Sequence, residues 1–432
     1  MKINRRDLLW GTGATALLGA SGPSSAASSK PEHLLFVIVD GGWDVTFCHD
    51  PKFHVDAIEG PEVDANPENP FDVDEVVTYG ENLDVVVNAH SRPSVGGYFD
   101  RWADRTAIVN GLWMGSIAHQ ACRIRLITGT ANSTRPDVVS ITGHQRGASL
   151  PLGSVDLSGL GVSGALAAST GRIGRSSQLK ALLDPNSRFP APDSADWSLP
   201  LLEPSSSEQE RTRAFVERRA AQFRDRYGVG AHNQGAVDGL LESLSRREHL
   251  LREGGPIIDG LELGLVPPLE AQADLAALMF KNKLCQSATL QNYENWDTHY
   301  FNRAQHDLYE GFFSSLDYLV AALDAAGVLD TTLIVVASEM TRTPKRNATG
   351  GKDHWAHSSA LLIGAGVQGG RTYGGTDENL ESQRMDLATG EVHAGGQLMK
   401  YDSFAAGILA AMDVDPGDWL PNVAPFTGAF DL

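Results

Sequence analysis

Short apolar runs, separated by longer polar and amphipathic stretches, organise this chain of 432 residues. The runs cover residues 33–39, 107–111, 287–290, 332–338 and 360–364. Runs of this length that close on a polar residue or a glycine are typical of parallel strands buried on both faces. The pattern therefore predicts five buried strands, the first of which ends at Asp40.

One amphipathic helix is clear between the third and fourth runs. Its apolar positions, which share one helical face, are Leu308, Phe312, Leu316, Leu319, Val320 and Leu323. Gly327 follows at a position where helices commonly end. The succession of strand, helix and strand predicts an α/β fold with a doubly wound, mostly parallel central sheet flanked by helices.

The segment 204–255 differs from the rest of the chain. It is rich in charged residues, it has a helical pattern over residues 208–226 and 237–252, and proline-containing loops flank it. We interpret it as a helical cap or insertion. The mature chain, residues 28–432, is then expected to form a single α/β domain that carries this insertion.

The first 27 residues have the three parts of a twin-arginine signal peptide. Arg5 and Arg6 precede a weakly apolar stretch over residues 8–18, and the small residues 24–27 offer a cleavage site. This stretch is too short for a membrane anchor, which needs about 20 apolar residues. We expect the twin-arginine translocase to export the folded chain to the periplasm or the extracellular space, without stable membrane insertion.

Composition narrows the range of partners. The chain is 42% hydrophobic and 21% charged, as is usual for a globular protein, and its formal net charge is −19. Such a surface repels nucleic acid, and it does not attract an anionic substrate from a distance. An anionic substrate would need a local positive centre, which a metal ion provides. Cys48, Cys122 and Cys285 are widely spaced and do not indicate which pair, if any, forms a disulfide.

Potential metal ligands gather next to the predicted strands. They are Asp40 after the first strand, Asp297 and His299 after the third, Glu339 after the fourth, and Asp353 and His354 before the fifth. Carboxylates and imidazoles suit zinc, manganese or another divalent ion, and calcium favours oxygen ligands alone. Functional groups of α/β sheets collect at strand ends. The sequence therefore predicts a divalent metal site.

Each of these residues also has a structural interpretation. Asp40 could be the N-cap of a helix, Asp297 could cap the turn before the next helix, and Glu339 could pair with Arg342. His354 could be a hydrogen-bonded loop histidine. Their joint position at strand ends favours the metal site over these alternatives.

Several motifs, in this order, resemble one bacterial family. They cover residues 36–42, 296–299, 338–344, 350–355 and 364–370. They are similar to those of the family known as domain of unknown function 1501, an exported branch of the alkaline phosphatase and sulfatase superfamily. The resemblance implies that Asp40 binds metal and that Glu339 stands where the superfamily has a metal-binding aspartate. It also implies a second metal position at Asp297, His299 and His354.

The segment 119–129 resembles the sulfatase signature that begins at the nucleophile. In this register His119 takes the place of the nucleophile and Arg123 that of the signature arginine. Gly41 stands where sulfatases have a second aspartate, and Met340 stands where they have a histidine or asparagine. We expect His119 at the start of a helix, facing the metal. The helix N-terminus should lower its pKa, so that the ring is neutral near pH 7.

Two functions remain open. The first is an exported, metal-dependent hydrolase of small phosphate or sulfate esters that uses zinc, manganese or calcium. Arg123 would hold the anionic group, and His119 would act as nucleophile, base or metal ligand. The second is a non-catalytic exported binding or envelope-associated protein on the same fold, with a vestigial or structural metal site.

Overall fold

A computed structural model describes residues 30–53, 55–64, 69, 71–173, 179, 183, 204–227, 231–255, 257, 263–264 and 266–432. The expected signal peptide, residues 1–27, lies outside the described residues. Within the described part of the chain, no helix combines the length and the apolar composition that crossing a membrane requires.

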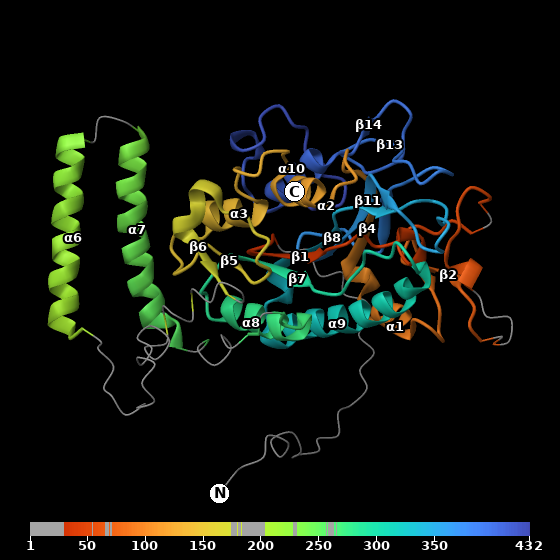
Figure 1. The fold of residues 1–432 in the computed structure, drawn as a ribbon, viewed down its shortest axis with the longest axis horizontal. Helices are drawn as coiled ribbons and strands as arrows, with labels where there is room; N and C mark the ends of the chain where they lie inside the picture. The colour runs from red at the N-terminus through yellow and green to blue at the C-terminus, as the bar shows by residue number, and fades with distance from the viewer. Residues whose placement is uncertain are drawn as a thin grey trace, which may run out of the picture.

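A central sheet of eight strands organises the molecule (Figure 1). In spatial order the strands are β12 (Arg371–Gly374), β4 (Thr106–Trp113), β11 (His357–Gly364), β8 (Thr332–Ser338), β1 (His33–Val39), β7 (Ser287–Asn292), β5 (Ser154–Asp156) and β6 (Thr170–Arg172). β11 runs antiparallel to β4 and β8, and the other neighbouring pairs are parallel. The α/β class with a mostly parallel sheet is confirmed, and each of the five apolar runs lies in one of these strands.

Helices cover both faces of the sheet (Figure 1). The helices α1 (Pro93–Trp102), α8 (Leu269–Lys281) and α9 (Gln305–Ala326) lie on one face, and α2 (His119–Thr128), α3 (Val138–Arg146) and α10 (Tyr401–Ala411) lie on the other. Side chains of β1 alternate between the two layers, because Leu35 and Val37 pack with the first set and Leu34 and Phe36 with the second. This burial on both faces explains why the sequence of β1 is an unbroken apolar run.

The predicted amphipathic helix is α9. Five residues of its apolar stripe are fully buried: Phe312, Leu316, Leu319, Val320 and Leu323. Gly327 ends the helix in a left-handed conformation, with a φ of 74°. The stripe and the end of this helix are therefore confirmed.

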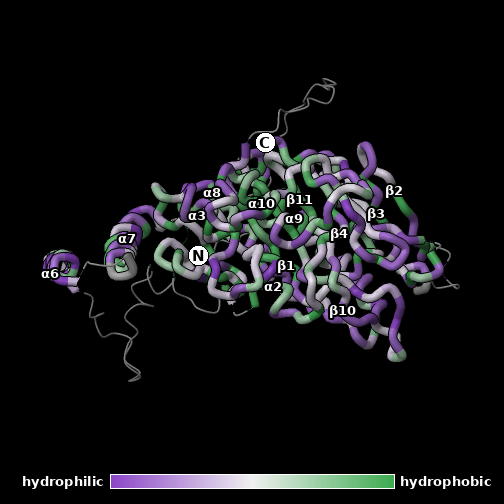
Figure 2. The backbone as a smooth tube through the Cα atoms, turned by 90° about the horizontal axis from the view of Figure 1, so that it is seen from above, coloured by the Kyte–Doolittle hydropathy of each residue, from purple (hydrophilic) through white to green (hydrophobic). Residues whose placement is uncertain are grey.

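The charged segment contains two long helices, α6 (Ser206–Tyr227) and α7 (Ala231–Glu253), as its pattern predicts. They stand side by side beyond β6, and Figure 2 shows that α6 is largely hydrophilic. Arg246 of α7 contacts the body of the molecule, where it donates a hydrogen bond of 3.0 Å to the carbonyl of Leu150. That this hairpin and the sheet form a single domain stays a prediction.

Candidate metal centre

Residues far apart in the sequence meet at one edge of the central sheet. β1, β4, β7 and β8 all run in the same direction, so their carboxyl ends share that edge. The residues that follow them are Asp40, His119, Asp297 and Glu339. Because β11 runs the other way, it begins at the same edge. A short ribbon of β9 (Thr341–Arg342) and β10 (His354–Trp355) brings His354 there.

The first set of ligand atoms, which we call the buried group, consists of Asp40, Glu339 and Nδ1 of His119. Glu339 is fully buried, and its Oε1 accepts a hydrogen bond of 2.9 Å from the backbone N–H of Gly41. His119 Nδ1 lies 2.7 Å from the same oxygen. Ligand atoms of the three residues all lie within 4.8 Å of one another. A cation between them would therefore have three ligands from this group.

Asp40 is the residue of the buried group with an unsatisfied atom. Its Oδ2 accepts a hydrogen bond of 2.8 Å from Nη1 of Arg123, but its buried Oδ1 has no hydrogen-bond partner among the described residues. Burial and the nearby charge of Glu339 raise the pKa of Asp40 to about 6. A buried carboxylate oxygen without a donor, next to a second carboxylate, is the environment that a metal ion stabilises.

The second set, which we call the histidine group, consists of Asp297, His299, His354 and Nε2 of His119. Oδ1 of Asp297 lies 3.0 Å from Nε2 of His299, 3.1 Å from Nε2 of His354 and 3.6 Å from Nε2 of His119. The Nε2 atoms of His299 and His354 are 2.9 Å apart. Two imidazole nitrogens that face each other share one proton at most, so this convergence of lone pairs fits the ligands of a metal ion.

Both histidines of this pair are held from behind. Nδ1 of His299 lies 3.0 Å from Oδ1 of Asp353, and Nδ1 of His354 lies 2.7 Å from the carbonyl oxygen of Ile117. Partners of this kind fix the ring so that Nε2 points inward, as they do around metal-binding histidines. Asp353, predicted as a ligand, thus contacts the outer side of His299, and its side chain is 59% exposed.

His119 occupies its predicted position but not its predicted electrostatic state. It is the first residue of α2, and it faces both groups. The prediction of a lowered pKa is wrong: the hydrogen bond that Nδ1 of His119 donates to the carboxylate of Glu339 raises the pKa of His119, although burial acts against it. A carboxylate at 2.7 Å outweighs the weaker field of a helix terminus.

Arg342 contacts the histidine group through Asp297. Its fully buried side chain donates hydrogen bonds to Asp297 Oδ1 at 2.8 Å, to the carbonyl of Gly42 at 2.7 Å and to the carbonyl of Gly41. Burial alone would raise the pKa of Asp297, but the hydrogen bond from His354 and the Arg342 guanidinium lower it. The alternative in which Arg342 pairs with Glu339 is therefore replaced by a pair with Asp297.

A buried ion pair joins two loops of the centre and was not anticipated from the sequence. Lys352 Nζ is 2.7 Å from Oδ2 of Asp44, and both side chains are fully buried. Asp44 lies in the loop that follows Asp40, and Lys352 lies in the loop that leads to His354. The pair thus ties together two loops that carry ligands. The only sequence signal was a lysine enclosed in the motif of residues 350–355.

Gly41 and Met340, which depart from the sulfatase pattern, have packing roles. Gly41 has a φ of 124°, and a Cβ atom on it would lie 2.9 Å from the backbone nitrogen of Asp297. Met340 is fully buried, and its side chain packs against Gly42. Neither position contributes a ligand atom to the two groups.

The cysteines are free and buried. Cys122, which lies on α2 close to His119 in sequence, donates a hydrogen bond of 3.0 Å to the carbonyl of Ser116. Burial raises the pKa of its thiol to about 11. A thiol in this state is a poor nucleophile, so Cys122 does not replace the missing hydroxyl of the sulfatase signature.

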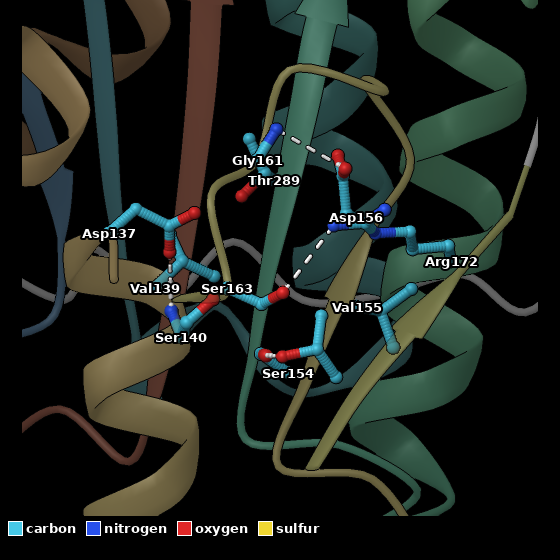
Figure 3. Close-up of a pocket in the computed structure, with 11 residues that line it drawn as sticks. Asp137, Val139, Ser140, Ser154, Val155, Asp156, Gly161, Ser163, Arg172 and Thr289 are labelled. Carbon is cyan, nitrogen blue, oxygen red and sulfur yellow. Dashed lines mark hydrogen bonds between the residues drawn. The ribbon is translucent and has the colours of Figure 1, made fainter. Parts of the chain in front are cut away.

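A small polar pocket lies further along the sheet, between α3, β5 and β6 (Figure 3). Asp156 accepts hydrogen bonds from the N–H groups of Ser158, Gly159 and Gly161. Asp137 likewise accepts from two backbone N–H groups, those of Ser140 and Val162. Because backbone donors already satisfy both carboxylates, this pocket stabilises its loops, and we do not assign a metal to it.

The fold and this edge of the sheet define an α/β protein with a candidate metal centre built from two adjoining groups of ligands. The chain belongs to the family described as protein of unknown function (DUF1501), which matches residues 32–418. No curated protein sequence matches the chain.

Several solved structures are similar in fold. One is the lipoteichoic acid synthase LtaP from Listeria monocytogenes, with 7% identity over 93% of this chain and 77% of that one, at a TM-score of 0.39. Another is the alkaline phosphatase from the Antarctic bacterium TAB5, with 11% identity over 90% of this chain and 99% of that one, at 0.38. A third is the PsFucS1 sulfatase from Pseudoalteromonas sp., with 12% identity over 93% of this chain and 74% of that one, at 0.39.

Proposed function

We propose that this chain is an exported, metal-dependent hydrolase of phosphate or sulfate esters. The observation that supports it is the meeting of two sets of ligand atoms on His119, with Arg123 beside them. The unsatisfied Oδ1 of Asp40 and the facing Nε2 atoms of His299 and His354 fit bound metal. Imidazole ligands favour zinc or manganese over calcium, which prefers oxygen.

The residues of such a centre would form two metal positions. Asp40, Glu339 and His119 would hold one ion, and Asp297, His299 and His354 would complete a second position. A divalent ion supplies Lewis acidity toward the ester oxygens and lowers the pKa of a coordinated water. Two ions and Arg123 also provide the local positive charge that a chain of net charge −19 needs to bind an anion.

Arg123 would hold the anionic group of the ester. Nη1 of its guanidinium donates a hydrogen bond to Asp40. The side chain of Arg123 is 22% exposed, so the guanidinium reaches the surface of the centre. A guanidinium presents several donors in one plane, which matches two oxygens of a phosphate or sulfate group. The hydrogen bond to Asp40 holds the guanidinium beside the buried group.

Water is the nucleophile that this arrangement favours. The thiol of Cys122 is tied to a backbone carbonyl, and the hydroxyl of Ser338 is fully buried against Glu339. Both ring nitrogens of His119 face ligand atoms, which favours a role for this ring in binding metal over direct attack on the ester. We therefore propose hydrolysis in one displacement, without a covalent intermediate on the chain.

The second candidate function is a non-catalytic binding protein that keeps a structural metal. Met340 and Gly41 favour it, because neither adds a ligand to the buried group, and His119 stands where the sulfatase signature has its nucleophile. A structural ion needs only a closed set of ligands, which the histidine group approaches.

One preparation tests both functions. The full chain would be expressed in a host with a twin-arginine translocase and purified after export, and its metal content would be measured before assays with aryl phosphate, phosphodiester and sulfate substrates. Bound divalent metal with turnover of one ester class supports the hydrolase. Metal without turnover supports the binding protein, and an export-competent, folded chain that binds no divalent metal overturns both.

Export has its own test. Changing Arg5 and Arg6 together to lysine removes the guanidinium pair of the proposed signal, so uncleaved precursor should accumulate in the cytoplasm. Fractionation and immunoblotting measure this directly. Normal export of the double variant would contradict the twin-arginine route and leave the metal centre untouched.

A further inference from the structure

His119 contributes to both groups of ligand atoms, and among the described residues it alone does so. Its two nitrogens face different partners. Nδ1 lies 2.7 Å from Oε1 of Glu339, whereas Nε2 lies 3.6 Å from Oδ1 of Asp297. The ring thus stands between the buried group and the histidine group, with one nitrogen on each side.

The surroundings of the ring leave both nitrogens directed at ligands. The ring of His354 packs edge-on against that of His119, with centroids 4.3 Å apart and an interplanar angle of 77°. This contact fixes the plane of His119 without using either of its nitrogens. Glu339 is held separately by the backbone N–H of Gly41, so the position of its carboxylate does not depend on His119.

We propose that the imidazole of His119 bridges two metal ions. Nδ1 bonds the ion that Asp40 and Glu339 share, and Nε2 bonds the ion that Asp297 and His354 hold. This inference rests on the metal centre of the proposed function. It assigns to one side chain a role in both positions.

The proton balance of this bridge is simple. A neutral imidazole has one nitrogen lone pair and one N–H, and so it binds a single ion. Binding a second ion releases the remaining N–H proton to solvent and leaves a bridging imidazolate, because ligation requires the deprotonated nitrogen. The two ions supply the positive charge that offsets this loss.

The bridge predicts an unusual spacing of the ions. Two-metal hydrolases commonly hold their ions about 3.5–4 Å apart. Two metal–nitrogen bonds of about 2 Å each, with an imidazole ring between them, place the ions farther apart than that. They nevertheless remain joined through the bonds of the ring, and unpaired electrons on the two ions would therefore interact.

The full chain loaded with copper(II) tests the bridge. We expect two ions per chain, an electron paramagnetic resonance signal that shows coupled spins, and no metal–metal distance of 4 Å or less in X-ray absorption spectra. Two ions with uncoupled spins, or a metal–metal distance of about 3.5 Å, would overturn the bridge and leave the proposed metal centre standing. A chain that binds no copper, zinc or manganese would refute the proposed function itself.

Variants assign the coupling to His119. His119→Gln offers one ligand atom in place of two, so the spin coupling should be lost while at least one ion stays bound. The matched variant His299→Gln changes only the histidine group. In every chain of this variant that holds two ions, the spin coupling should persist. Coupling that survives in a folded His119→Gln chain would show that another group forms the bridge.

Discussion

The two ligand groups share an imidazole but differ in their contact with solvent. The difference lies in Glu339, which is fully buried, whereas Asp40 beside it is 26% exposed and Asp297, the carboxylate of the histidine group, is 36% exposed. Charge removed from water is costly unless it is compensated, so a cation bound to the buried group would stabilise the fold as well as supply chemistry. Water already solvates part of the histidine group. The two positions should therefore differ in how strongly metal binding is coupled to folding.

The largest effect is expected from breaking the buried Lys352–Asp44 pair, which joins a loop of the buried group to a loop of the histidine group. Lys352→Met leaves the buried carboxylate of Asp44 without its cationic partner, although Thr46 and Asn302 still donate hydrogen bonds to it, and should lower the free energy of unfolding by about 3–5 kcal/mol. Urea denaturation of the metal-free chain measures this loss. The double variant Lys352→Met/Asp44→Asn removes both charges and should recover part of it. Equal stability of the single variant and the unchanged chain would contradict the structural role of the pair.

A smaller effect separates the buried group from the histidine group. Glu339→Gln retains an oxygen that accepts the hydrogen bond from Gly41 but removes the charge that binds metal. Affinity for one ion should fall at least about 100-fold, and the stabilisation of about 2.7 kcal/mol that this ion gives at 100 times its dissociation constant should disappear. Metal titration followed by thermal unfolding shows both results. A variant that binds and is stabilised like the unchanged chain would contradict the role of Glu339.

The corresponding change in the histidine group is His354→Ala. We expect one ion to bind about 10–100-fold more weakly, while the ion of the buried group still stabilises the fold. Metal content after dialysis and the shift in melting temperature on adding zinc distinguish the two positions. If His354→Ala abolished the thermal stabilisation as Glu339→Gln does, the contrast between the groups would fail.

The smallest effect concerns the outer partner of His299. Asp353→Asn keeps an oxygen near Nδ1 of His299 but removes the charge that orients the ring, so affinity at the histidine group should fall about 10-fold. The exposed Glu378, changed to glutamine, serves as the control for loss of one surface charge. A loss as large as that of His354→Ala would instead make Asp353 a direct ligand, as the sequence first suggested.

The strands were predictable because burial on both faces leaves an unbroken apolar run, as in β1. The direction of β11 could not be predicted, because a buried apolar run has the same pattern in a parallel and an antiparallel strand. His354 precedes its strand and still reaches the shared edge, because β11 is antiparallel. Had β11 been parallel, the same motif would have been placed at the opposite edge of the sheet.

The candidate ligands were predictable from residue type and position, but the charges that support them were not. Lys352 and Arg342 are long cationic side chains, which usually lie at the surface, and only the folded loops show that both are fully buried. The raised pKa of His119 likewise depends on Glu339, which is 220 positions away in the sequence. Local patterns carry no information about such long-range partners.

The conformation of Gly41 limits which substitutions this position can accept. A side chain at this position would meet the backbone of Asp297 at 2.9 Å and that of Trp296 at 3.1 Å, in a conformation that L-residues rarely adopt. A mutation that introduced a carboxylate at position 41 would therefore displace the neighbouring loop before the new oxygen could bind an ion. In this chain, an aspartate at position 41 would therefore need a compensating change in the loop of Trp296 and Asp297 before it could act as a ligand.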